Sequence, residues 1–169
     1  MSEIASMRMR MPGETKLSPG RDFTIRAFRS QDQVATRELV LEGLGERWGV
    51  IDESRNPDLD DIATFYVSKG HMVLIAEDDS GILGSGALVV TDRRAQMVRV
   101  SVRATERRRG IASAIVEELV EIARERGVRR IEVETNNDWH SAIRLYERHG
   151  FVEYARDAES VYLARELPE

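Results

Sequence analysis

Hydrophobic residues follow two different periods along the chain, and the place where one gives way to the other is the most informative stretch. Apolar residues alternate with polar ones at Val98, Val100 and Val102. This period of two is typical of a strand. After a charged turn, apolar residues recur at helical spacing from Ile111 onward, and Gly127 is placed to end the helix. Residues 98–127 therefore predict a strand, a short turn and a long helix.

The same periods predict the other elements. Strands are expected at residues 23–28, 72–76, 82–90, 130–135, 151–155 and 161–167. Further helices are expected at residues 33–46, 58–70 and 139–149. The strands before and after the long helix must run parallel, because a helix crosses between them. The sequence thus predicts a mixed α+β fold, with an antiparallel first half that leads into one parallel βαβ crossover.

Residues 1–21 show neither period. Met, Arg, Pro and Gly dominate this segment, which also lacks the apolar core of a signal peptide. We expect residues 1–21 to form a flexible N-terminal tail and residues 22–169 to form a single domain. A chain of 169 residues that is 41% hydrophobic is long enough for one substantial core.

Composition narrows the classes of function. The net charge of −5 argues against general nucleic-acid binding, which needs a broad basic surface. The absence of cysteine removes disulfides and any cysteine nucleophile, and it suits a cytoplasmic location. The three histidines are too scattered to predict a metal site, and no apolar run is long enough to span a membrane. We expect no metal, no nucleic acid and no membrane as partners.

Three consecutive arginines occupy the turn before the long helix. Arg107, Arg108 and Arg109 stand where the helix dipole is already positive, which costs roughly 0.3–1 kcal/mol for each cation. A bound anion would reverse that cost, and Gly110 would allow a phosphate to approach the main chain. A solvated basic turn explains the same charges equally well. The charges alone leave both interpretations open.

The spacing within this turn adds a resemblance. Arg107-x-x-Gly110-x-Ala112 resembles the (Arg/Gln)-x-x-Gly-x-(Gly/Ala) signature with which the GNAT-type N-acetyltransferase superfamily holds the pyrophosphate of acetyl-CoA. The chain has neither of the other common phosphate-loop patterns, G-x-x-x-x-G-K-[ST] and G-x-G-x-x-G. The position of the motif between a predicted strand and an amphipathic helix strengthens the match.

A second segment resembles the same superfamily. Residues 142–151 read A-I-R-L-Y-E-R-H-G-F, similar to the Ala-Ile-x-Leu-Tyr-x-x-x-Gly-Phe segment of these enzymes. Both segments occur in the expected order, and the order of elements matches over residues 22–167. The chain is thus identified as a GNAT-type member. The resemblance implies a mostly antiparallel central sheet with one parallel crossover and helices on both faces.

The resemblance also implies where acetyl-CoA would bind. The amides from Arg108 to Ser113 would surround the pyrophosphate, and a V-shaped slot between two splayed strands would take the pantetheine arm. Asn137 would replace an asparagine that members often carry where this chain has Trp139, or it would only begin the following helix. The implied cofactor-binding residues are Val100, Val102, Arg107, Arg108, Arg109, Gly110, Ile111, Ala112, Ser113 and Asn137.

Two catalytic residues are implied. Tyr146 would be the general acid that protonates the departing sulfur, the alternative being a core tyrosine with a satisfied hydroxyl. Gln96 stands near the place where many members carry a glutamate base, and Gln cannot accept a proton. Related enzymes instead carry a glutamate on the fifth strand, in a Leu-Glu-Thr pattern that residues 133–135 resemble. The resemblance therefore implies Glu134 as the preferred base, at the end of the strand toward the splay, while Glu132 lies on the same strand face. A plain surface role for either glutamate, or a water chain as the base, stays open.

The expected activity is direct transfer of an acetyl group from acetyl-CoA to a primary amine in a ternary complex, because the chain has no cysteine for a covalent intermediate. The acceptor is a small-molecule amine, a protein N-terminus or a lysine. An acidic rim, with Trp48 beside it, favours a cationic amine. The rim consists of Glu42, Glu46, Asp52, Glu53, Asp58, Asp60 and Asp61. An acetyl-CoA sensor of the same fold is the alternative, and a homodimer is an open assembly.

Overall fold

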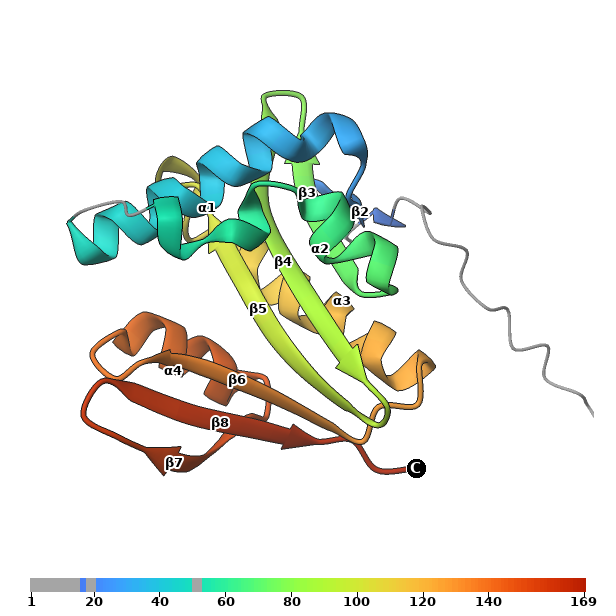
Figure 1. Cartoon of the computed structure of the whole chain (residues 1–169), viewed down its shortest axis with the longest axis vertical. Coiled ribbons are helices and arrows are strands. Elements are labelled where there is room, and N and C mark those ends of the chain that lie inside the picture. Colours follow the sequence, from blue (N-terminus) through green and yellow to red (C-terminus); the bar gives the residue numbers. More distant parts are fainter. Residues whose placement is uncertain (1–15, 18–20, 50–52) are drawn as a thin grey trace, which may run out of the picture.

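The computed structural model describes residues 16–17, 21–49 and 53–169, and these form one sheet with helices on both faces. The strands are β1 (Lys16–Leu17), β2 (Thr24–Ala27), β3 (Met72–Asp78), β4 (Gly81–Thr91), β5 (Arg94–Val102), β6 (Arg130–Asn136), β7 (Val152–Arg156) and β8 (Ser160–Glu166). The helices are α1 (Gln33–Trp48), α2 (Ile62–Phe65), α3 (Ile111–Glu125) and α4 (His140–Arg148). Figure 1 shows the order of the elements.

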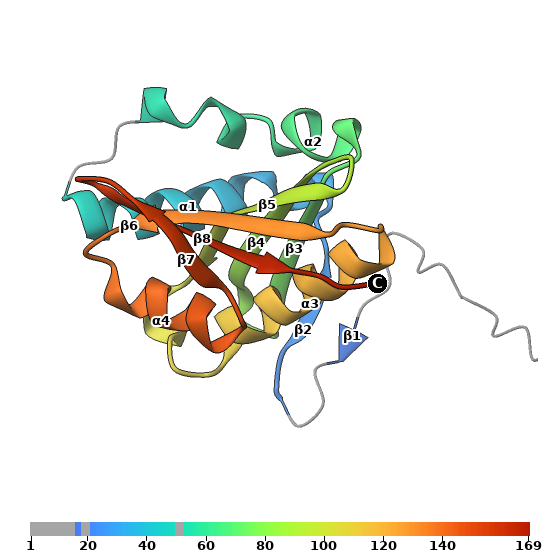
Figure 2. The ribbon, with the colours of Figure 1, turned by 90° about the horizontal axis from the view of Figure 1, so that it is seen from below.

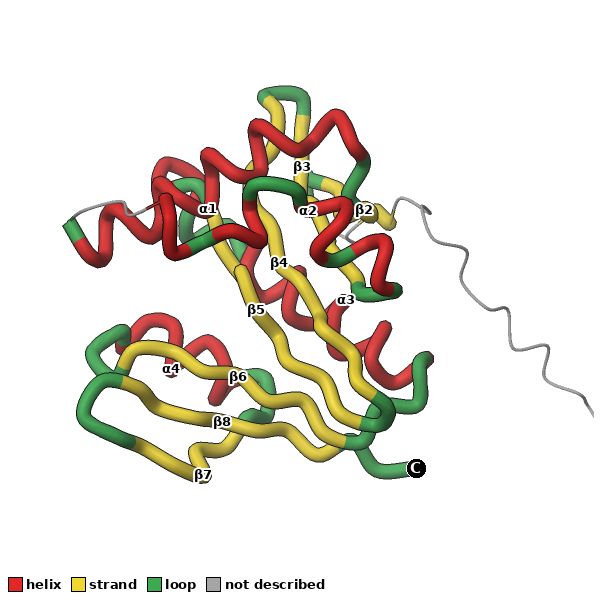
Figure 3. Tube along the Cα trace, viewed as in Figure 1, coloured by secondary structure: helices red, strands yellow, loops and turns green. Residues whose placement is uncertain are grey.

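The sheet confirms the predicted fold class. Its strands lie in the order β1-β2-β3-β4-β5-β6-β8-β7. Among the described strands, β5 and β6 are the parallel pair and all other neighbours are antiparallel. Helix α3 makes the crossover between β5 and β6, as the period change at residues 98–127 predicts (Figure 3).

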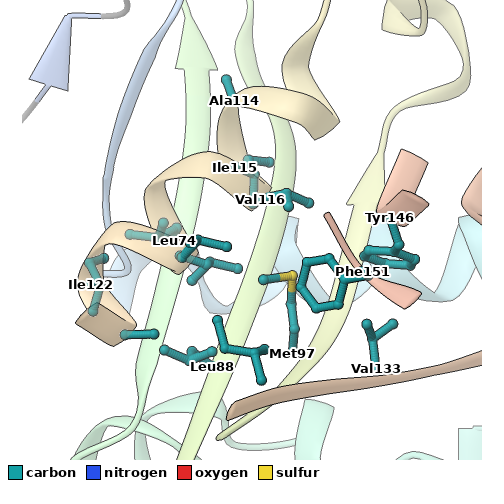
Figure 4. Close-up of a cluster of buried hydrophobic side chains, with 14 of the residues drawn as sticks. Leu74, Leu88, Met97, Ala114, Ile115, Val116, Ile122, Val133, Tyr146 and Phe151 are labelled. Atoms are coloured by element: carbon teal, nitrogen blue, oxygen red, sulfur yellow. The ribbon is translucent and has the colours of Figure 1, made fainter. Parts of the chain in front are cut away.

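The helices divide the apolar side chains between two faces of the sheet. Helices α1 and α2 lie on one face and α3 and α4 on the other (Figure 2). The larger core lies under α3, where Ile115 and Leu119 are fully buried against the strands, and it continues to Phe151 beside α4 (Figure 4). A smaller core joins Leu39 of α1 and Ile62 of α2 to the opposite face.

Two segments differ from the sequence-based expectation. The helix expected at residues 58–70 is reduced to α2 and short 3-10 turns, because the carboxylate of Asp61 caps α2 while that of Asp58 binds an arginine of β5. The expected tail at residues 1–21 contains the strand β1, which pairs with β2. Residues 1–15 and 18–20 lie outside the described part, so the extent of the tail and of the single domain stays a prediction.

A β-bulge interrupts the alternation of valines in β5. The register between β4 and β5 shifts at residues 85–87, and Arg99 opposite has a φ of 56°. As a result Val98 packs on the α1 and α2 side, whereas Val100 and Val102 pack on the α3 side. A bulge bends the strand that contains it, so the second half of β5 runs in a different direction from the first half.

A buried charge network fixes the start of α1 to the sheet. The Arg26 guanidinium is 5% exposed and donates to both carboxylate oxygens of Asp32, at 2.7 and 2.9 Å. It also donates to both oxygens of Glu77 on β3, at 2.6 and 2.9 Å. Burial by itself would raise the pKa of Asp32, but the hydrogen bonds from Arg26 and the Arg29 amide outweigh it and lower that pKa.

We expect Asp32→Ala to lower the free energy of unfolding by about 3–5 kcal/mol, because it leaves a buried guanidinium half-paired. Asp60→Ala is the matched control: its exposed pair with Arg37 is 3.3 Å long, so the loss should stay below about 1 kcal/mol. The wild-type contribution of Asp32 is complete above about pH 4 and is lost as the pH falls through its lowered pKa. Urea denaturation measures both effects. Equal losses of unfolding free energy in Asp32→Ala and Asp60→Ala would contradict a special stabilising role for the buried pair of Asp32 with Arg26.

Candidate active site

The parallel strands β5 and β6 separate along their length and leave a cleft. They pair from Arg94 and Arg130 only as far as Gln96 and Glu132. Beyond this point the bulge directs β5 away from β6, and Figure 1 shows the two strands spreading toward α1 and α4. A cleft of about 1330 Å³ opens there, lined by residues of α1, β5, β6, α4 and the turn before α3.

One edge of β5 faces this cleft with free backbone groups. The Arg103 amide donates to the Leu83 carbonyl of β4 at 2.8 Å. Because amide direction alternates along a strand, the amide of Val102 points the other way, toward the side where β6 has departed. Val100 lies two residues earlier on the same stretch, and both valines line the cleft. The predicted positions of Val100 and Val102 thus coincide with an unpaired strand edge.

The turn before α3 presents backbone N–H groups to the cleft. Arg108 and Gly110 have left-handed φ values of 67° and 76°. The amides of Ile111, Ala112 and Ser113 have no acceptor within the helix, because they form its first turn. Left-handed residues next to a helix start make an anion-binding concavity, and a left-handed arginine costs roughly 1–2 kcal/mol. All five residues line the cleft.

Two of the three turn arginines face the cleft. The Arg107 guanidinium pairs with Glu46 of α1 at 2.5 Å, which joins the turn to the opposite wall. Arg108 is exposed, and no described residue forms an ion pair with it. Arg108 is therefore the turn cation that is available to a ligand.

The side chain of Arg109 is not part of the cleft. It donates to Asp22 at 2.8 Å and to Glu106 at 2.5 Å, and it lies 3.4 Å from Asp78. The hydrogen bond from Arg109 lowers the pKa of Asp22. Three carboxylates already surround the charge of Arg109, so the cofactor binding that the resemblance implies for this residue stays a prediction for its backbone. Only its backbone can contribute to the turn.

Asn137 is also held away from the cleft. Its amide nitrogen donates to the carbonyls of Ala158 at 2.8 Å and Asp157 at 3.4 Å. These bonds secure the turn between β7 and β8, and Asn137 is not among the residues that line the cleft. The structure therefore gives Asn137 a structural role, and the cofactor contact that the resemblance implies for it stays a prediction. Trp139, by contrast, does line the cleft.

Tyr146 of α4 reaches the cleft from the core. The residue is 7% exposed, and its ring packs edge-to-face on Phe151 with 5.6 Å between centroids (Figure 4). No described residue hydrogen-bonds its hydroxyl, and the one buried side-chain oxygen or nitrogen without a partner in the described part belongs to Thr36. The hydroxyl is therefore reachable from the cleft. Burial raises the pKa of Tyr146 to about 12, which keeps the phenol protonated.

The two glutamates of β6 have different surroundings. Glu132 lies at the closed end of the cleft, where one of its oxygens accepts from Arg130 at 2.7 Å and from Arg94 at 3.1 Å. Glu134 lies beyond the last β5–β6 pair, is exposed, and accepts a hydrogen bond from the Ser160 hydroxyl at 2.9 Å. No described cation pairs with Glu134, so it is the glutamate that can accept a proton in the open part of the cleft.

The model of the acetyltransferase (GNAT) family matches residues 35–151. This match runs from α1 to the residue before β7 and so includes the splayed strands, the turn and Tyr146. The chain belongs to the GNAT family.

Membrane-spanning helices and metal clusters are both absent from residues 21–49 and 53–169. No helix in this part is long and apolar enough to cross a membrane. The same residues contain no group of three or more acidic or histidine side chains placed to hold a metal.

Relatives in sequence agree with this membership. Human N-acetyltransferase 8B is 33% identical over 108 residues, which cover 60% of this chain and 48% of that protein. The N-acetyltransferase YsnE of Bacillus subtilis is 30% identical over 95 residues, or 51% of this chain and 63% of that protein. The chain thus spans about half the length of the human relative.

The fold is shared with solved GNAT structures. An acetyltransferase of the GNAT family from Staphylococcus aureus has a TM-score of 0.79 at 19% identity, covering 86% of this chain and 99% of that one. The PaiA N-acetyltransferase of Thermoplasma acidophilum, solved in complex with coenzyme A, has a TM-score of 0.76 at 15% identity, with the same coverage. YncA of Salmonella typhimurium, solved with its cofactor acetyl-CoA, has a TM-score of 0.74 at 18% identity and covers 88% of this chain and 96% of that one.

Three carboxylates of the acidic rim are ion-paired, with Glu46 on Arg107, Asp58 on Arg99 and Asp60 on Arg37. A fourth, Asp61, accepts a hydrogen bond from the Thr64 amide. Asp52 and the side chain of Glu53 lie outside the described residues. Each paired carboxylate attracts a cationic amine less strongly than a free one would.

An ion-paired cluster that the sequence did not reveal lines the cleft. Arg99 donates to both oxygens of Asp58, at 2.7 and 2.9 Å, and the Tyr66 hydroxyl bonds the same carboxylate at 2.5 Å. Burial and Asp58 together raise the pKa of Tyr66 to about 12. Arg99 reaches Asp58 because the bulge turns its side chain toward the face of the sheet that α1 and α2 cover. The alternation of apolar and polar residues in a strand does not indicate where a bulge adds an extra residue.

A second missed group stands where α1 meets α4. The Arg47 guanidinium lies 4.1 Å from the centroid of the Trp139 ring, and Trp48 packs edge-to-face on the same ring at 5.7 Å. All three residues line the cleft. The only signal in the sequence is the presence of Trp48 and Trp139, which does not say that they meet.

Proposed function

We propose that this GNAT protein moves an acetyl group from acetyl-CoA to a primary amine by direct transfer in a ternary complex. The observation that carries the proposal is the splay of β5 and β6 between the amide-rich turn and the Tyr146 hydroxyl. Binding of coenzyme A or acetyl-CoA by the Thermoplasma and Salmonella proteins of the same fold supports it further.

The residues of the cleft fit acetyl-CoA. The amides of Ile111, Ala112 and Ser113 and the unpaired Arg108 suit a pyrophosphate, since each can donate to an anion. The free edge of β5 at Val100 and Val102 suits an amide-containing arm that pairs as a strand would. Bound acetyl-CoA would supply the activated acetyl group.

The remaining chemistry belongs to side chains of this protein. The Glu134 carboxylate would accept the proton that the amine loses, directly or through a water. The Tyr146 hydroxyl, neutral at physiological pH, would donate its proton to the departing sulfur. A free backbone N–H of β5 would donate to the carbonyl oxygen as negative charge develops there.

A pair of glycine variants tests the cofactor half of this proposal. Gly110 and Gly127 flank the two ends of α3 with φ values of 76° and 75°, but only Gly110 lines the cleft. A Cβ disfavours a left-handed φ by roughly 1–2 kcal/mol, so the turn of Gly110→Val should relax in the free protein and would have to regain this φ on binding. We therefore expect Gly110→Val to raise the Kd for acetyl-CoA roughly 5- to 30-fold. Gly127→Val should lose similar stability without changing Kd.

Titration calorimetry with acetyl-CoA measures these values. Equal effects of the two variants on Kd would show that the turn is only a surface feature, and a folded wild-type protein that binds no acetyl-CoA would end the proposal. Coenzyme A release that increases with added amine separates an enzyme from an acetyl-CoA sensor of the same fold.

A further inference from the structure

Arg47 is an exposed cation on the α1 wall of the cleft. Its guanidinium carbon lies 4.1 Å from the centroid of the Trp139 ring, and Trp48 packs edge-to-face on the same ring, so the guanidinium makes a cation–π contact with a tryptophan pair. Tyr146 lines the same cleft and is close enough for the charge of Arg47 to act on the pKa of its phenol. The cation is therefore next to the place where transfer would occur.

Arg47 is a cation of the cleft without a carboxylate partner. Arg99 and Arg107 of the cleft are paired with Asp58 and Glu46, whereas Arg108 and Arg148 also form no ion pair with a described residue. No described residue forms an ion pair with Arg47. Partial loss of hydration is the largest effect that lowers the pKa of Arg47, and repulsion from Arg107 lowers it further. An anion arriving in the cleft would relieve both effects.

We propose that Arg47 binds a carboxylate on the acceptor, so that the amine to be acetylated is an amino acid or another amine that carries a carboxylate. This inference rests on the proposed acetyl transfer. A guanidinium holds a carboxylate through two parallel hydrogen bonds, which would orient the acceptor as well as bind it. The rings of Trp48 and Trp139 offer an apolar wall to the remainder of the acceptor.

A phosphate of acetyl-CoA has the same anionic chemistry and is the competing source. The structure favours the acceptor, because the turn already provides the free amides of α3 and Arg108 for phosphates. Arg47, on the other wall, stands with the tryptophans and near Tyr146. If Arg47 binds the acceptor's carboxylate, its loss raises the KM for the acceptor. If Arg47 binds a phosphate of acetyl-CoA, its loss raises the KM for acetyl-CoA.

The experiment follows coenzyme A release with the standard amino acids and with the matching amines that lack the carboxylate, such as phenylalanine beside 2-phenylethylamine. Wild-type protein should favour the carboxylate-bearing member of a pair. Arg47→Gln should raise KM for that member roughly 10- to 100-fold, the loss expected for hydrogen bonds to a charged group, and leave the matching amine and acetyl-CoA nearly unchanged. Arg47→Lys, which keeps the charge, should recover part of the loss.

Arg124→Gln is the matched control, because Arg124 pairs with Glu121 near the far end of α3 and does not line the cleft. A wild-type preference for amines without a carboxylate, or an equal loss for both members of a pair in Arg47→Gln, would overturn the proposal. A raised KM for acetyl-CoA alone would assign Arg47 to the cofactor and overturn it too, while acetyl transfer stands. No release with any amine would remove the proposed function and this inference together.

Discussion

Tyr146→Phe is expected to lower kcat roughly 10²- to 10⁴-fold, the contribution of a positioned general acid. The variant keeps the ring on Phe151 and removes only a hydroxyl that no described residue hydrogen-bonds. Folding and the Kd for acetyl-CoA should therefore stay close to wild type. Steady-state coenzyme A release and titration calorimetry measure the two quantities separately.

Tyr162→Phe is the control for this experiment. Tyr162 also lines the cleft, but its hydroxyl donates to Asp157 at 2.9 Å. Its loss should change kcat only a few-fold, since its proton is committed to a structural bond. Comparable losses in the two variants would indicate that any cleft tyrosine matters equally, and the acid would have to be sought elsewhere.

The pH dependence provides a second check on Tyr146. Burial destabilises the phenolate, so the pKa is raised to about 12 and the acid form persists at every pH below that value. We expect kcat/KM to rise with pH as the amine loses its proton and to show no fall due to Tyr146 below about pH 10. A descending limb near neutral pH that disappears in Tyr146→Phe would contradict this account.

Glu134→Gln is expected to lower kcat/KM roughly 10²- to 10⁴-fold, as for the loss of a general base. The amide has nearly the same shape and can still accept the hydrogen bond from Ser160, so the structure should be kept. Glu132→Gln is the matched change two residues earlier. Its carboxylate is already bound by Arg94 and Arg130, so activity should change little while stability falls slightly.

Rates for both variants, measured with the same amine at several pH values, test the assignment. An activity within about threefold of wild type in Glu134→Gln would show that a water chain is the base. A larger loss in Glu132→Gln than in Glu134→Gln would transfer the role to the closed end of the cleft.

Local periodicity predicted the elements on which the site is built. The change of period at residues 98–127 predicted β5, α3 and the parallel partner strand, because a helix that crosses between strands leaves little choice of direction. The end of α3 at Gly127 followed from the same reasoning, and Gly127 has a left-handed φ of 75°. These features depend on neighbours in the chain, which a sequence displays directly.

Whether each arginine of the turn before α3 forms an ion pair depends mainly on residues that are distant in the chain. Arg107, Arg108 and Arg109 are equivalent in the sequence, yet one binds Glu46, one is unpaired and one is surrounded by carboxylates. The residues predicted for the site also include Asn137, which the structure assigns to the turn between β7 and β8. Spacing within a motif gives the backbone path, but the direction of a long side chain depends on which partners the fold brings within reach.

The sequence by itself determined the family signature, the crossover and the positions of Tyr146 and Glu134 on their elements. Only the tertiary structure revealed the bulge at Arg99 that opens the cleft. It alone also revealed the contact between Arg47 and Trp139. The physical reason is that periodicity reports which face of an element is buried. It does not report where a strand gains an extra residue, or which end of one helix comes to lie over the start of another.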